Sequence, residues 1–288
     1  RVNWNVEDLI GGDKHLDFNR PFMPESLARV DQLDFLTPKE RIVLNQIRGH
    51  DYLYIFGLVE EFILPFVLDH ARPILSGNDA RVRAFLNFAG EEAKHIDLFK
   101  RFRKDFLNSF GTSCDVIGPP EAIAQAILSK HPLAVALVIL HIEWMTQRHY
   151  LDSIADNGDL DPQFKSLLKH HWMEESQHAK LDSLMAQAIY DASSEQERAQ
   201  AIDGYLEIGG MIDSGLMQQV KFDFESLQRA TGRIFTQEET DRFFAVQQQA
   251  TRWTFLGSGM SHPNFLAVAD LVKPGAGDQL AQIAPMFS

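Results

Sequence analysis

The chain has 288 residues, of which 45% are hydrophobic and 23% charged, as is typical of a globular protein with a sizeable core. Forty aspartates and glutamates against 27 lysines and arginines leave a net charge of −13, which argues against a nucleic-acid partner. The longest uncharged apolar run, Leu133 to Leu140, is far shorter than the roughly 20 residues that cross a bilayer, so no membrane span is expected.

The cysteine content and the N-terminal sequence bear on the compartment. The single cysteine, Cys114, can form neither an intramolecular disulfide nor a multi-cysteine metal site. No basic stretch followed by an apolar one marks a targeting signal. Both features favour a reducing, cytoplasmic setting. Because the chain begins with Arg1 rather than methionine, we expect that it has been trimmed, which leaves open a leader that was removed.

Strong helix signals begin after the first 36 residues. A capping box at 37–40, with proline in the first helical position, opens an apolar-periodic stretch that runs to about residue 70. A second long helix is expected from an N-cap at Asn78 or Asp79 to about Phe110, where Gly111 ends the pattern.

The rest of the chain also has helical signals, including two more capping boxes, at 194–197 and 236–239. No sustained alternation of apolar and polar residues predicts a half-buried sheet, and the last thirty residues are rich in glycine and proline. The fold class is therefore predicted to be all-α. Further helices are expected at about 120–130, 132–156, 162–192, 195–229 and 237–256.

Two Glu-x-x-His motifs, Glu92 to His95 and Glu175 to His178, lie on the second and fourth long helices. At a spacing of i, i+3 the carboxylate and the imidazole share one helix face. Either motif alone is weak evidence of a metal site. Together they supply half of the ligand pattern of a carboxylate-bridged dimetal bundle.

The other half of that pattern is one glutamate from each remaining long helix. The first offers Glu60 or Glu61 and the third offers Glu143, all within apolar stretches. From Glu60 to Glu92 is 32 residues, and from Glu143 to Glu175 is also 32. At ~1.5 Å per residue, two helical hairpins of matching size bring their glutamates to the same height in the core.

Four carboxylates buried together would cost several kcal/mol for each uncompensated charge. Two divalent cations cancel those four charges. Carboxylates combined with imidazoles favour iron or manganese, and bridging carboxylates suit two metals within about 4 Å.

His171 breaks the symmetry of the two hairpins. It lies four residues before Glu175, so it forms an i, i+4, i+7 stripe with Glu175 and His178, whereas the matching position in the first hairpin is Phe88. A third histidine extends the candidate metal-ligand set to seven residues: Glu60, Glu92, His95, Glu143, His171, Glu175 and His178.

This pattern resembles the p-aminobenzoate N-oxygenase family of di-iron arylamine oxygenases, over about residues 38–190. The resemblance implies a ferritin-like four-helix bundle, usually dimeric, with those seven residues as ligands; by local pattern Glu60 fits the first ligand better than Glu61. It also implies a non-haem di-iron monooxygenase that binds O2 as a peroxo species and N-oxygenates an aryl amine or a related small substrate. An external electron donor and a homodimer are then expected.

Other interpretations of the same ligands stay open. One is a di-iron oxidase that hydroxylates or desaturates a fatty or amino-acid substrate, which needs a long apolar tunnel rather than a short wide pocket. Another is a non-enzymatic ferroxidase or iron-storage subunit, and a third is a manganese catalase. We expect a single domain over 1–288, in which helices at about 195–256 cover the bundle or form a dimer interface.

Several neighbouring residues are expected to stay outside the ligand set. Glu91 and Glu174 are predicted to be solvated or to form salt bridges that contribute little to stability, and His141 and His149 to be structural. Asp182 lies four residues beyond His178 on the same face. It is expected either to orient a ligand histidine through a hydrogen bond or to cap the bundle surface.

Overall fold

The computed structural model describes residues 3–77 and 79–287. These residues form helices and no β-strand, which confirms the all-α prediction. Asn78, one of the two expected N-caps, lies outside the described residues. The α-helices in chain order are α1 (Glu25–Ala28), α2 (Pro38–Ala71), α3 (Asp79–Phe110), α4 (Pro120–Leu128), α5 (Pro132–His149), α6 (Pro162–Ala192), α7 (Glu195–Thr231), α8 (Gln237–Arg252), α9 (Ser258–Met260), α10 (Pro263–Val272) and α11 (Ala276–Ile283).

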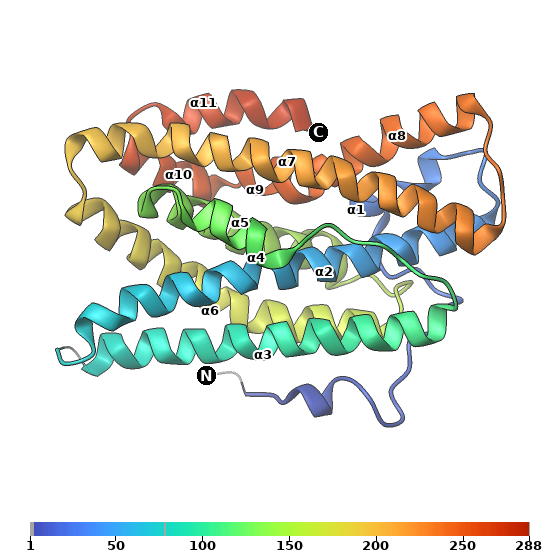
Figure 1. The fold of residues 1–288 in the computed structure, drawn as a ribbon, viewed down its shortest axis with the longest axis horizontal. Coiled ribbons are helices and arrows are strands. Elements are labelled where there is room, and N and C mark those ends of the chain that lie inside the picture. The colour runs from blue at the N-terminus through green and yellow to red at the C-terminus, as the bar shows by residue number, and fades with distance from the viewer. Residues whose placement is uncertain (1–2, 78, 288) are drawn as a thin grey trace.

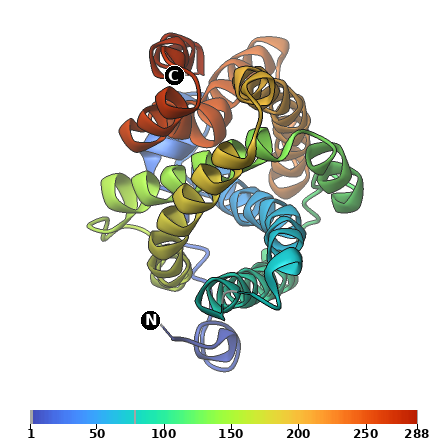
Figure 2. The same ribbon diagram turned by 90° about the vertical axis from the view of Figure 1, so that its left-hand side faces the viewer.

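The core is a four-helix bundle of two hairpins, α2 with α3 and α5 with α6 (Figure 1). A crossover that contains α4 joins the hairpins and packs against α2 and α5. Figure 2, which looks along the long axis, shows the four helices arranged around a common centre. One long crossover between two helical hairpins is the topology of the ferritin-like bundles.

Caps set the start of the long helices as predicted. Glu40 N–H donates to Thr37 Oγ1 at 3.3 Å, and Thr37 N–H donates to the Glu40 carboxylate at 2.8 Å. The same reciprocal pair forms at the starts of α7 and α8. Each cap satisfies backbone donors that a helix start otherwise leaves unpaired.

Helix α5 lies at the centre of the molecule. All residues from Leu133 to Glu143 are buried, because α6 packs on one side of α5 while α7, α9 and α10 pack on others. The apolar run of α5 is thus a core helix that is apolar all round. Over the described residues, no helix combines the length and the apolar character that a membrane crossing requires.

The C-terminal region contains more helix than its composition indicates. The expected helix at 237–256 ends as α8 at Arg252 and continues through a π-helical turn, Trp253–Gly257. Beyond it, α10 and α11 form where no helix was expected. Gly275, with φ of +84°, makes the left-handed turn between them, which glycine adopts without steric cost.

The N-terminal segment passes alongside α3 before it reaches α2 (Figure 1). Asn45 of α2 holds part of it, since its side-chain oxygen accepts from Phe22 N–H at 2.7 Å and from Met23 N–H at 2.9 Å. Asp161, the N-cap of α6, accepts from Asp17 N–H at 2.9 Å. This segment carries Trp4 to the bundle, where its ring is buried.

Candidate metal centre

The structure brings all seven predicted ligands together in the core of the bundle, and all seven are buried. They form two clusters that share Glu175. Within each cluster, one ligand atom from every residue lies within 4.8 Å of the others. The first cluster is Glu60, His95, His171 and Glu175, and the second is Glu92, Glu143, Glu175 and His178.

Glu175 lies between the two clusters and presents one oxygen to each. Its Oε1 is 3.0 Å from His95 Nδ1 and 3.0 Å from His171 Nε2. Its Oε2 is 3.2 Å from His178 Nδ1. A carboxylate with its two oxygens directed to two neighbouring clusters has the geometry of a bridging ligand.

Glu60 and Glu61 are distinguished by their positions on α2. Glu60 is 2% exposed, and its Oε1 lies 2.9 Å from His171 Nε2. Glu61 points away from the clusters and pairs with Lys100 at 2.7 Å. Of the two glutamates, Glu60 is therefore the one that the fold places in the site.

Glu91 and Glu174 are buried rather than solvated, whereas the alternative expectation of a salt bridge holds for Glu174, which pairs with Lys94. Glu174 is fully buried, and His95 Nε2–H donates to its Oε2 at 2.8 Å. Glu91 is 8% exposed, and His178 Nε2–H donates to its Oε2 at 3.0 Å. Because carboxylates only accept, these bonds hold the proton on Nε2 and leave the Nδ1 lone pair free to bind a metal.

Each motif orients the histidine of the other motif across the bundle. Glu174 of α6 binds the histidine of α3 and also accepts from Lys94 Nζ at 2.5 Å. Glu91 of α3 binds the histidine of α6. The sequence contains a signal for this role, because both motifs are Glu-Glu-x-x-His and the first glutamate occurs in both of them.

Unpaired polar atoms test whether the site fits a metal. Buried polar atoms in proteins almost always have hydrogen-bond partners, so a group of unpaired ones that face one space points to a missing cation. Among the described residues, six atoms of the two clusters form no hydrogen bond of good geometry, although His95 Nδ1 lies 3.0 Å from Glu175 Oε1 and Glu92 Oε1 lies 2.9 Å from His178 Nδ1. The six atoms are Glu60 Oε2, Glu92 Oε1, Glu92 Oε2, His95 Nδ1, Glu143 Oε2 and Glu175 Oε1.

The pKa shifts of the site residues also indicate a site that binds cations. Burial, together with Glu175 and Glu60, raises the pKa of Glu92 to about 7. Burial alone would lower the pKa of His95, but the adjacent carboxylates raise it well above its ordinary value. Without cations the site therefore gathers protons to offset its negative charge, and divalent ions can take the place of those protons.

Aromatic rings enclose the clusters. The ring of Phe88 lies 4.2 Å from that of His178, and those of Phe56 and Phe99 lie 5.3 Å and 5.0 Å from that of His171. All three phenylalanines are buried. On the far side of His95, the Trp4 ring stacks at 5.8 Å and 13°. These contacts leave little room for bulk water near the ligands.

The remaining predicted residues lie outside the clusters. His149 is held between Tyr52 and Ser258, at 2.9 Å from each hydroxyl. Asp182 is buried, but neither of its oxygens accepts a hydrogen bond from the described residues, so neither expected role is seen. Burial raises its pKa well above the ordinary value, which favours a neutral acid.

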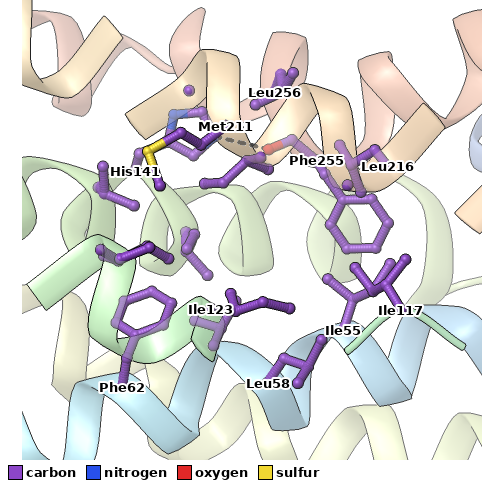
Figure 3. Close-up of a pocket in the computed structure, with 18 of the residues that line it drawn as sticks. Ile55, Leu58, Phe62, Ile117, Ile123, His141, Met211, Leu216, Phe255 and Leu256 are labelled. Atoms are coloured by element: carbon purple, nitrogen blue, oxygen red, sulfur yellow. Dashed lines mark hydrogen bonds between the residues drawn. The ribbon is translucent and has the colours of Figure 1, made fainter. Parts of the chain in front are cut away.

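The structure contains an apolar cavity of about 290 Å³ (Figure 3), three of whose lining residues also line the small space between the two clusters. It is formed by α2, α4, α5, α7 and the turn at 253–257. Its side chains are aliphatic or aromatic except for His141 and Tyr205. Concave apolar spaces next to a few polar groups are typical binding sites for small molecules.

Comparison with known proteins finds only distant likeness. No family model and no curated protein matches the chain. Among solved structures, a variant of an R2-like ligand-binding oxidase with an anaerobically reconstituted Mn/Fe cofactor has 16% identity and a TM-score of 0.44, covering 89% of this chain and 87% of that one. Another variant, with an aerobically reconstituted Fe/Fe cofactor, has 16% identity and a TM-score of 0.40, covering 86% and 88%. This likeness does not assign the chain to a family.

Proposed function

We propose that the chain is a non-haem di-iron oxygenase that uses O2 to oxidise a small organic substrate, with N-oxygenation of an aryl amine as its first candidate reaction. The observation that carries the proposal is the pair of buried clusters joined by Glu175. Two divalent cations would cancel the four glutamate charges. Carboxylate and imidazole ligands suit iron or manganese rather than a thiolate-bound zinc site.

The seven residues would hold the two ions unequally. The first cluster has two histidines and two glutamates, whereas the second has one histidine and three glutamates. The difference comes from His171, which therefore supports the resemblance to the arylamine N-oxygenases. When bound, the two irons would supply the electrons that reduce O2, and the chain supplies a dry, oriented setting.

The reaction balances with an external electron donor. An amine, O2, two electrons and two protons give a hydroxylamine and water: a new N–O bond forms, the O–O bond breaks, and the second oxygen leaves as water. The donor is a reductase or another low-potential electron carrier. Phe56, Phe88 and Phe99 exclude water from the ligands. This exclusion favours oxidation of the substrate over release of hydrogen peroxide or other products of O2 reduction.

A second candidate is oxidation of an alkyl chain, which the apolar cavity favours. The same two irons would support this reaction with the same stoichiometry of O2, electrons and protons, and a C–O bond would form in place of the N–O bond. Product analysis separates the two, because ¹⁸O2 would label a hydroxylamine or nitro compound in one case and an alcohol in the other.

The test uses the full chain loaded anaerobically with Fe(II), then given ¹⁸O2, a chemical reductant and an aryl amine. We expect two irons per chain and one labelled oxygen in the first product, detected by mass spectrometry. Glu60→Gln should lose at least tenfold in product formation, whereas its neighbour Glu61→Gln should match the native chain. A parallel reaction replaces the aryl amine with an alkyl substrate. The absence of labelled product from both substrates, or iron uptake far beyond two ions per chain, would contradict the proposal.

A further inference from the structure

The apolar cavity and the metal centre share a wall. Phe56, Val59 and Ile142 line the cavity and also line the small space between the clusters, which Glu60 and Glu143 border on the other side. A molecule in the cavity is therefore separated from the ligands by one layer of side chains. Rotation of those side chains would bring it to the metal centre.

The two polar residues of the cavity satisfy each other. His141 Nδ1 lies 2.6 Å from the Tyr205 hydroxyl, and Nε2 lies 3.2 Å from the Phe255 carbonyl (Figure 3). A carbonyl only accepts, so Nε2 carries the proton and donates it, and Nδ1 accepts from the Tyr205 hydroxyl. Burial lowers the pKa of His141 to about 4, so the ring is neutral at pH 7.

This pairing leaves no side-chain donor and no positive charge for an anionic ligand. A carboxylate in the cavity would lose its water without gaining a partner, which is strongly unfavourable. A neutral apolar molecule meets no such penalty, since nearly all of the surrounding surface is hydrocarbon.

The space depends in part on a glycine in the middle of α7. Gly209 lines the cavity, and a Cβ at this position would meet no atom within 4 Å. No close helix contact therefore requires glycine here, although glycine is unfavourable inside a helix. Its neighbour Gly210 also has free space around a Cβ, but it is exposed and does not line the cavity.

We propose that this cavity is the substrate site and that it takes a neutral, apolar molecule without a carboxylate, which reaches the clusters past Phe56, Val59 and Ile142. The identity of the bound molecule as a substrate rests on the proposed function. Its binding does not, because the cavity walls are preformed by α2, α4, α5 and α7.

Calorimetry with two matched anilines tests the binding on the full chain without O2 or reductant. The probes are 4-butylaniline, which is neutral at pH 7, and 4-aminobenzoate, which carries a carboxylate. We expect one 4-butylaniline per chain and at least tenfold weaker binding of 4-aminobenzoate. Gly209→Leu should weaken 4-butylaniline binding at least tenfold, whereas Gly210→Leu, the same change one residue away, should keep it within twofold.

The results of these experiments test the cavity proposal and the proposed function separately. Equal binding of the two anilines, or equal effects of the two leucine variants, would overturn the cavity proposal. The aniline comparison needs no variant, and circular dichroism shows whether Gly209→Leu is folded. If 4-butylaniline binds as expected but loaded protein gives no labelled product, the proposed function fails alone. If labelled product forms without cavity binding, the cavity proposal fails alone.

Discussion

At the scale of single residues, the metal centre depends most on the pairing of two of its three candidate histidine ligands, His95 and His178, with a buried glutamate outside the ligand set. Glu174 receives the Nε2 proton of His95, and Glu91 receives that of His178. A histidine held in this way presents Nδ1 in one fixed direction and is a stronger ligand. Metal affinity should therefore depend on residues that do not touch the metal.

Glu174→Gln tests this dependence. The amide keeps the size of the side chain and can still accept from His95, but it removes the charge that strengthens the bond and pairs with Lys94. We expect affinity for Mn²⁺ to fall roughly 10- to 100-fold, measured by competition with a chromophoric chelator. Glu61→Gln, on the surface of α2, is the control; if both variants bind alike, Glu174 has no such role.

The sequence predicted the candidate metal ligands but not the glutamates that hold the histidines. Six of the seven candidate ligands were predicted because two motifs and two glutamates recur at the same interval of 32 residues, which needs only helix geometry. His171 was predicted from its stripe with Glu175 and His178. The partners of the histidines were missed. One of these pairs joins positions 79 residues apart and the other joins positions 87 apart, on facing helices whose relative rotation a single-helix pattern does not reveal.

At the scale of elements, an ionic cluster ties the bundle to the helix that covers it. Arg48 of α2 contacts Asp51 at 2.9 Å and Asp223 of α7 at 3.4 Å, and all three side chains are buried. Gln219 Nε2–H donates to Asp223 at 2.8 Å. Two carboxylates thus depend on one guanidinium, which makes Arg48 the critical member.

Arg48→Met should destabilise the protein by about 3–5 kcal/mol, because it leaves two buried carboxylates without a positive charge. Urea unfolding measures the loss. Arg72→Met removes the exposed pair with Asp69 and should cost less than about 1 kcal/mol. Similar losses in the two variants would contradict this account, and replacing Asp51 and Asp223 by asparagine alongside Arg48→Met should recover part of the loss.

The helices themselves were predicted closely where proline or capping boxes mark their starts, as in α2, α7 and α8. The π-helical turns at Tyr150–Ile154 and Trp253–Gly257 and the short C-terminal helices were not predicted. Helix α10 begins with His262 as N-cap and Pro263 in the first turn, but its ten residues follow a region whose glycines and prolines indicate a loop. Packing against α5, α7 and α11 stabilises it instead.

At the scale of the whole molecule, buried neutral histidines link stability to pH. His50 is 1% exposed, neither ring nitrogen has a hydrogen-bond partner within residues 3–77 and 79–287, and its ring stacks on Phe106 with 4.7 Å between the ring centroids. Burial, with a smaller contribution from Arg103, lowers its pKa to about 3. Between that value and the ordinary 6.5, the unfolded chain binds a proton that the folded chain does not, so the native state loses stability as pH falls.

His50→Phe should remove this contribution while it keeps the ring stacked on Phe106. We expect the difference in the free energy of unfolding, variant minus native chain, to increase by roughly 1.4 kcal/mol for each pH unit between pH 6.5 and about pH 4 as the pH falls. Urea titrations at pH 7.5 and pH 5 measure the difference. His15→Phe, at an exposed position, should leave the dependence of the unfolding free energy on pH unchanged. If the unfolding free energies of His50→Phe and the native chain differ by the same amount at both pH values, His50 does not cause the loss of stability at low pH.

More than half of the residues that line the cavity lie outside the four helices that carry the candidate metal ligands, and this affects how such a protein can evolve. The candidate metal ligands lie on α2, α3, α5 and α6, whereas α4, α7 and the turn at 253–257 supply much of the cavity. Substitutions on these outer elements can reshape the choice of substrate while the oxidising centre stays intact. One scaffold could thus acquire new specificities in single steps, beginning at positions such as Gly209.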